Sequence, residues 1–242
     1  MFRHRNKGRT FLHNIKLAAL LSTVAGTVNI VGVLAFGTLT TNVTGHFAFL
    51  SEDLYLNRYS LAMVSMLYVG SFFVGAFLAS TCMELTSKNT DHFSYMVPLS
   101  IEILLLGTVA LSDFMVQQFP VWLSCILLLA MGLQNALVTR ISGSVVRTTH
   151  LTGLFTDLGI ELSQLIFYKD RNDRNRLRHS IMLRGIIVTG FFLGGLVGAF
   201  LFGWLGRKTL LLPVFILFIA LYYDRVLIVY YRSVRKHRKK IK

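Results

Sequence analysis

Two short segments of this sequence combine threonine hydroxyls with glycine, a composition that suits the binding of a small polar solute or an ion. They are 40–45 (Thr-Thr-Asn-Val-Thr-Gly) and 148–153 (Thr-Thr-His-Leu-Thr-Gly), with four of six aligned positions identical. Hydroxyls, freed carbonyls and helix N-termini hold such ligands where helices are interrupted. We predict a substrate-binding set that adds one asparagine before each segment: Asn29, Thr40, Thr41, Asn42, Thr44, Asn135, Thr148, Thr149, His150 and Thr152.

The same residue types also have purely structural explanations. A threonine hydroxyl commonly bonds to a carbonyl of its own helix, and an asparagine inside a helix bundle often joins two helices without binding a ligand. For any single threonine the structural explanation is the better one. For the two clusters together we give both explanations equal weight.

Glu102 is the single residue with the sharpest chemical signal. It lies near the middle of an apolar run, one helical turn after Pro98. An ionisable side chain at such a depth is costly and marks a functional site by default. We predict that Glu102 couples proton movement to transport. The alternative is a structural hydrogen bond from its carboxyl group to a neighbouring helix.

Patterns typical of enzymes and metal sites are missing from the sequence. It contains no His-Glu-x-x-His, no cysteine pair at metal-ligand spacing, no Gly-x-Ser-x-Gly and no P-loop. We therefore expect no enzymatic activity, no cofactor and no bound metal.

The elements that must position these residues are long apolar runs. Of 242 residues, 54% are hydrophobic and 15% charged, against about 25% charged in a soluble domain, and the mean hydropathy is +0.59. A membrane-crossing helix needs roughly 20 mostly apolar residues. We predict an all-α integral membrane protein with six transmembrane helices: Leu17–Leu39, Tyr59–Met83, Ser94–Ser112, Val121–Thr139, Gly185–Gly206 and Thr209–Val229.

The threonine-rich segments belong to a longer internal repeat. Gly26–Asn29 corresponds to Gly132–Asn135, and Phe72–Gly75 corresponds to Phe191–Gly194. Each copy holds three helices, and an odd number makes the second copy enter the membrane in the opposite sense. We predict two inverted three-helix repeats, with broken or re-entrant segments after helices 1 and 4. The parts are a basic N-terminus (1–16), repeat 1 (17–116), repeat 2 (119–231) and a basic tail (232–242).

Small residues recur every four positions in helices two and five of this scheme. Gly190, Gly194 and Gly198 form one ladder, and Ser71, Gly75 and Ala79 form the other. Such ladders let helices approach closely. We predict that helices two and five pair with each other.

The distribution of positive charge predicts the orientation. With both termini in the cytoplasm, every Lys and Arg except Arg58, Arg207 and Lys208 falls on the inner side, as the positive-inside rule requires. The basic tail then suits contact with anionic lipid better than binding of nucleic acid. The expected partners are the lipid bilayer, anionic lipids and an unidentified small solute or ion, and a homo-oligomer is left open.

Residues 155–167 have the pattern of an amphipathic helix on the inner surface. Asp157 and Glu161 are four residues apart and share one face. We expect this acidic face to pair with Arg140, Arg147 or the basic insert 169–178. Arg147, Asp157 and Glu161 therefore form a predicted set of inner-face charges.

Several of these motifs together resemble the YoaK-like family, a family of bacterial inner-membrane proteins with a domain of unknown function. The motifs are Gly26-x-x-Asn29, the Thr-Gly segment after helix one, Met-Gly-Leu-Gln-Asn-Ala136, and Thr-His-Leu-Thr-Gly153 followed by Asp-Leu-Gly159. The resemblance covers roughly residues 15–230 and implies the fold and a location in the bacterial inner membrane, but no established activity. Family members carry Asp where this chain has Asn29, and Glu102 matches their carboxylate in the third helix.

The function that these features favour is a transporter or channel for a small solute or ion. The alternative is a membrane protein that transports nothing and binds lipid or a protein partner through its basic tail and inner amphipathic helix.

Overall fold

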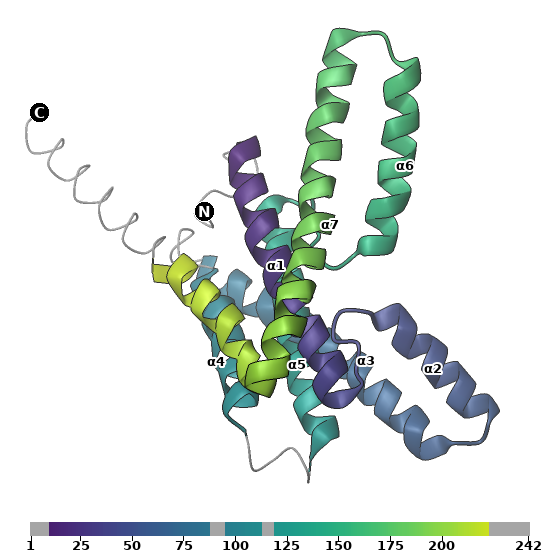
Figure 1. The fold of residues 1–242 in the computed structure, drawn as a ribbon, viewed down its shortest axis with the longest axis vertical. Coiled ribbons are helices and arrows are strands. Elements are labelled where there is room, and N and C mark those ends of the chain that lie inside the picture. The colour runs from purple at the N-terminus through teal and green to yellow at the C-terminus, as the bar shows by residue number, and fades with distance from the viewer. Residues whose placement is uncertain (1–9, 88–94, 113–118, 223–242) are drawn as a thin grey trace, which may run out of the picture.

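A computed structural model describes residues 10–87, 95–112 and 119–222, and every regular element in these ranges is helical (Figure 1). The all-α prediction is confirmed for this part of the chain. In chain order the elements are α1 (Phe11–Phe36), α2 (Val43–Tyr55), α3 (Tyr59–Ser87), α4 (Met96–Leu111), α5 (Pro120–Ser142), α6 (Leu151–Phe167), α7 (Arg171–Leu205) and the 3-10 turn η3 (Gly206–Leu210). Residues 211–222 continue as helix after η3. Of the predicted termini, residues 1–9 of the segment 1–16 and the whole tail 232–242 lie outside the described residues, and residues 11–16 form the start of α1.

Four helical stretches of the described chain are long and apolar enough to cross a membrane: Phe11–Phe36, Tyr59–Thr86, Pro120–Ser142 and Arg171–Tyr222. The last of them contains the predicted fifth span and the described part of the sixth, with η3 between them. The predicted third span is α4, whose 16 residues are fewer than the roughly 20 of a straight crossing. The chain is a multi-pass helical membrane protein.

Large apolar side chains on the outside of the bundle agree with that environment. Trp204 is 90% exposed, Phe200 70% and Phe73 67%. In water such a surface would be strongly unfavourable, whereas in a bilayer these side chains face lipid. The buried core lies inside, where Leu21 of α1 and Leu137 of α5 have no exposed surface.

Two helix crossings hold the bundle together, and each is closed at a glycine. The most extensive contacts join α1 to α7 and α3 to α5. A Cβ at Gly26 would lie 2.9 Å from the carbonyl carbon of Phe191, and one at Gly132 would lie 2.9 Å from that of Phe72. Only glycine lets the two backbones approach this closely.

The same crossings are closed a second time by Gly194 and Gly75. A Cβ at Gly194 would lie 2.8 Å from the carbonyl carbon of Thr23, and one at Gly75 would lie 2.9 Å from that of Leu129. The glycine ladders therefore mark close helix contacts as predicted. The predicted pairing of helices two and five is wrong, because α3 packs on α5 and α7 packs on α1.

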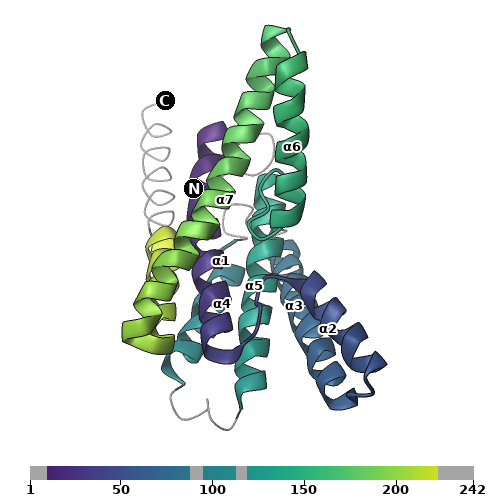
Figure 2. The ribbon, with the colours of Figure 1, turned by 45° about the vertical axis from the view of Figure 1, so that its right-hand side comes forward.

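Two helical hairpins extend from the bundle. α2 packs against α3 and α6 packs against α7. Figures 1 and 2 both show the α6–α7 hairpin projecting at the end where α1 starts, and the α2–α3 hairpin projecting at the other end. The predicted amphipathic helix 155–167 is the greater part of α6. Most of the basic insert 169–178 is the first part of α7, which Asp170 caps by accepting a hydrogen bond from Asn172 N.

Candidate functional site

The helices are interrupted at the two segments that the sequence singled out. α1 ends at Gly37 and α5 ends at Gly143, and both glycines adopt the left-handed conformation, with φ of 64° and 63°. A residue with a Cβ is strained there, whereas glycine is not. The chain then runs without helix through 37–42 and 143–150. In Figure 2 the first of these stretches turns back toward the middle of the molecule before α2 begins.

Each interruption is tied back to its preceding helix by the asparagine predicted for it. The backbone N–H and the hydroxyl of Thr41 both donate to Asn29 Oδ1, at 3.3 and 3.0 Å. The hydroxyl of Thr149 donates to Asn135 Oδ1 at 2.7 Å. Asn29 and Asn135 lie on the matched Gly-x-x-Asn motifs of α1 and α5, so the two interruptions are held by equivalent contacts.

The two segments, far apart in the sequence, line one cavity of about 460 Å³, which we call the threonine cavity. Six residues of the predicted binding set line it: Thr41, Asn42, Thr44, Thr149, His150 and Thr152. This volume lies in the range of small-molecule sites. The sequence placed both segments in one binding set, and the structure brings these six residues to a common space.

Thr40 and Thr148 do not line this cavity and have no exposed surface. The hydroxyl of Thr148 accepts a hydrogen bond of 3.5 Å from Gln134 Nε2, which also donates to the carbonyl of Leu21 at 3.0 Å. The hydroxyl of Thr40 has no hydrogen-bond partner among the described residues. Gln134 was missed by the sequence analysis, although a fully buried glutamine in an apolar helix is a detectable signal.

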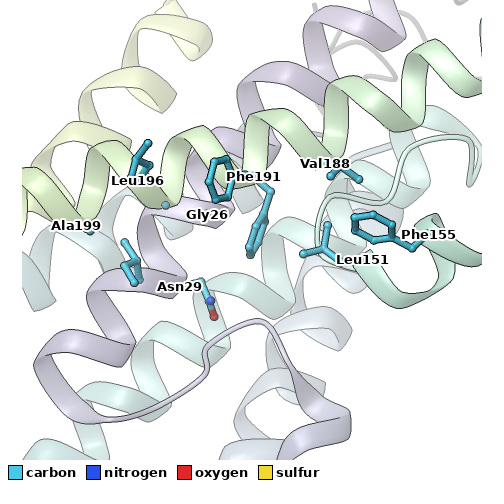
Figure 3. Close-up of a pocket in the computed structure, with 11 residues that line it drawn as sticks. Gly26, Asn29, Leu151, Phe155, Val188, Phe191, Leu196 and Ala199 are labelled. Atoms are coloured by element: carbon cyan, nitrogen blue, oxygen red, sulfur yellow. The ribbon is translucent and has the colours of Figure 1, made fainter. Parts of the chain in front are cut away.

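A second cavity, of about 510 Å³, adjoins the first and is almost entirely apolar. Figure 3 shows Leu196 and Ala199 of α7 at one end, Leu151 and Phe155 of α6 at the other, and the amide of Asn29 at the edge. Leu151 lines both cavities. The interior at the interruptions is therefore polar on one side of Leu151 and apolar on the other.

Two of the three predicted inner-face charges lie at a third cavity, of about 240 Å³, which shares His150 with the threonine cavity. Arg147 and Asp157 line it, and the partner of Asp157 is Arg184 of α7, at 3.1 Å. Arg184 also forms an ion pair with Glu161. The predicted pairing with Arg140, Arg147 or the insert is corrected here, since Arg184 lies outside the insert and Arg140 pairs with Glu84 of α3.

Glu102 lies in α4 and is not among the residues that line the threonine cavity. Its side chain has no exposed surface, and neither carboxyl oxygen has a hydrogen-bond partner among the described residues. Burying an unpaired carboxyl group in a membrane helix is costly. No group of three His, Cys, Asp or Glu that could hold a metal ion occurs among the described residues.

A bundle of apolar helices, two of them interrupted around a polar cavity, defines a polytopic helical membrane protein. The chain belongs to the family described as "Protein of unknown function (DUF1275)", whose model matches residues 17–223. It is similar to the UPF0700 transmembrane protein YoaK of Bacillus subtilis (strain 168), at 26% identity over 186 residues, 76% of this chain and 81% of that protein. The predicted YoaK-like family is confirmed. No solved structure matches the chain.

Proposed function

We propose that this protein is a transporter or channel that moves a small solute or an ion across the bacterial inner membrane through the threonine cavity. The observation that carries the proposal is that six polar residues from two helix interruptions line one space inside a bundle of apolar helices. Non-helical backbone at membrane depth is tolerated only where it is covered by protein or lines a water-filled cavity. A solute pathway accounts for both the interruptions and their hydroxyls.

We further propose that the chain consists of two inverted three-helix repeats with six membrane spans. Matched contacts support this arrangement: Gly26 meets Phe191 as Gly132 meets Phe72, and Asn29 holds Thr41 as Asn135 holds Thr149. The α2–α3 and α6–α7 hairpins, which follow equivalent interruptions, project at opposite ends (Figure 1). Inverted repeats around a central site are typical of secondary transporters.

The proposed orientation puts both termini in the cytoplasm. The start of α1 and the α6–α7 hairpin lie at the same end (Figure 2). That hairpin carries Arg171, Arg174, Arg176 and Arg178 in its exposed first turns of α7. An excess of Lys and Arg marks the cytoplasmic side of a membrane protein.

Glu102 is the proposed proton-coupling residue. A buried carboxyl group with no partner among the described residues is favoured in its neutral, protonated form, and it would release the proton when a movement exposes it or brings a cation to it. Because Glu102 does not line the threonine cavity, coupling would act through the movement of α4 against α5, which α4 contacts.

Purified protein in liposomes tests the proposal. Stopped-flow light scattering with glycerol and with potassium chloride measures whether either solute enters faster than into protein-free liposomes, and a trapped pH dye reports proton movement. We expect Glu102→Gln to abolish proton movement that accompanies the solute. Glu52→Gln, at an exposed position of α2, serves as the matched control. Equal proton movement in the Glu102→Gln variant would remove the coupling role, and no flux of either solute would contradict transport.

A further inference from the structure

The hydrogen-bond polarity of the threonine cavity follows from the orientation of two asparagine amides. The backbone N–H of Thr41 lies 3.3 Å from Asn29 Oδ1, and a backbone N–H needs an acceptor. The atom that faces Thr41 is therefore the amide oxygen, since the amide nitrogen would place two donors against each other. The Thr41 hydroxyl, 3.0 Å from the same oxygen, must then be a donor.

The orientation of Asn135 is fixed independently by its own helix. Its Nδ2 donates to the carbonyl of Met131 at 2.9 Å, and a reversed amide would place two oxygens together. Oδ1 of Asn135 therefore faces Thr149, whose hydroxyl donates to it at 2.7 Å. In both halves of the molecule the one O–H group of the threonine is used in a hydrogen bond to the asparagine oxygen.

Two hydroxyl oxygens that line the cavity thus have only lone pairs left for a ligand. Thr41 and Thr149 can accept hydrogen bonds from a solute but cannot donate to it. Thr44 and Thr152, at the next matched positions of the two segments, also line the cavity. Their hydroxyls form no hydrogen bond with another described residue, so they can donate or accept.

Thr156 also lines the cavity, and its hydroxyl donates to the Thr152 carbonyl. The Asn42 amide nitrogen remains a donor, because its Oδ1 accepts from Gly45 N. A ligand therefore meets fixed acceptors, adaptable hydroxyls and an amide donor in this cavity.

The charge of the lining disfavours the two simplest kinds of ionic ligand. No Asp, Glu, Lys or Arg is among the described residues that line the threonine cavity. A cation would find no carboxylate, and an anion would find no Lys or Arg, to compensate for its lost hydration. An anion would also face the lone pairs of Thr41 and Thr149, which oppose the attraction of the N–H groups in the first turns of α2 and α6.

We infer that the solute of this cavity is uncharged and donates hydrogen bonds to Thr41 and Thr149 through hydroxyl or amide N–H groups. The inference rests on the proposed transport function and names the chemical class of its solute. A small polyol meets the requirement, because each of its hydroxyls donates one hydrogen bond and accepts others. Glycerol is therefore the probe. Potassium chloride is its ionic counterpart, measured with valinomycin to reveal entry of the anion and, with permeant thiocyanate in place of chloride, to reveal entry of the cation.

The experiment uses the full-length protein in liposomes, with permeability measured by stopped-flow light scattering. We expect glycerol to enter faster than into protein-free liposomes and potassium chloride not to do so. Replacing both threonines with valine (Thr41→Val with Thr149→Val) keeps the side-chain shape and removes both acceptors. We expect glycerol permeability to fall about tenfold, as for the loss of two hydrogen bonds.

Two controls separate chemistry from folding. The pair Thr41→Ser with Thr149→Ser keeps both hydroxyls and should retain glycerol permeability. Thr189→Val removes a hydroxyl on the exposed face of α7, which donates to its own helix at Gly185, and should change nothing. Glycerol permeability that survives in the valine pair would overturn the inference.

The wild-type measurement alone also decides the question. Entry of potassium chloride without glycerol would overturn the uncharged solute and leave the proposed transport function standing. Entry of neither solute would overturn both. Entry of glycerol alone is the expected result.

Discussion

The interruptions after α1 and α5 use the same frame with different details. In both, a left-handed glycine ends the helix, and an asparagine three residues after a crossing glycine binds a threonine of the interruption. They differ in the residues around that bond. Asn29 also holds a backbone N–H of its segment, whereas Asn135 bonds to its own helix.

The comparison separates the contacts that are the same in both halves of the molecule from those that differ. The glycine crossings and the asparagine-to-threonine bonds are duplicated, and they fix where each segment lies. The buried threonines Thr40 and Thr148, which we call the buried threonine pair, do not have matching contacts. The hydroxyl of Thr148 is hydrogen-bonded to Gln134, whereas that of Thr40 has no partner among the described residues. The two interruptions are therefore held in equivalent positions, but the hydrogen bonding of Thr40 and Thr148 differs between the two halves.

The largest expected effect tests the symmetry of the crossings. Gly26→Ala and Gly132→Ala each place a methyl group against the opposite backbone, at Phe191 and Phe72. Such overpacking should cost about 1–3 kcal/mol in each variant, measured as a loss of thermal midpoint in detergent by circular dichroism. Gly203→Ala is the control, since a Cβ there meets nothing within 4 Å. A loss of thermal midpoint in only one of the two variants would show that the two crossings are not equivalent.

A smaller difference in stability should distinguish substitutions at the two asparagines. Asn29→Asp keeps the oxygen that accepts both hydrogen bonds from Thr41, whereas Asn135→Asp brings a carboxyl oxygen against the carbonyl of Met131. We expect Asn135→Asp to be less stable than Asn29→Asp by about 1–2 kcal/mol, the cost of an unsatisfied buried group. Denaturation of the two variants in the same detergent measures the difference. Equal stabilities would mean that the Met131 contact is not important.

The smallest expected effect on stability concerns the buried threonine pair, Thr40 and Thr148. Thr40→Val removes a buried hydroxyl that lacks a described partner, so stability should stay level or rise by up to about 1 kcal/mol. Thr148→Val takes an acceptor from Gln134 and should lower stability by about 0.5–1 kcal/mol. Thermal midpoints of the two variants give the comparison. A larger loss in Thr40→Val than in Thr148→Val would contradict the assignment of partners.

The sequence singled out the two segments that line the cavity because their residues recur in order. Thr41 and Thr149, like Thr44 and Thr152, stand at matched places, and helix interruptions follow from glycine and from the length of the apolar runs. Partners across the bundle could not be predicted in the same way. The glycine ladders of α3 and α7 showed that both helices approach another backbone closely, but the spacing of small residues carries no information on which backbone that is.

The ion pairs illustrate the same limit. Asp157 and Glu161 were recognised as one acidic face, yet their partner is Arg184 rather than the more conspicuous basic insert. Which arginine meets them depends on how α6 folds back along α7, a property of the hairpin rather than of local spacing. Gln134 was overlooked because its role depends on α1, where it bonds to the carbonyl of Leu21.

The pairing of α1 with α7 has a consequence for synthesis of the protein. Gly26 of α1 closes against Phe191, so α1 leaves the ribosome long before α7, the helix it packs against, has been synthesised. At about 5–20 residues per second, that wait is on the order of ten seconds or more. During it α1 must be held in the bilayer by its own hydrophobicity or by the insertion machinery. The pair α3 and α5 can form earlier, which makes that crossing the natural nucleus of assembly.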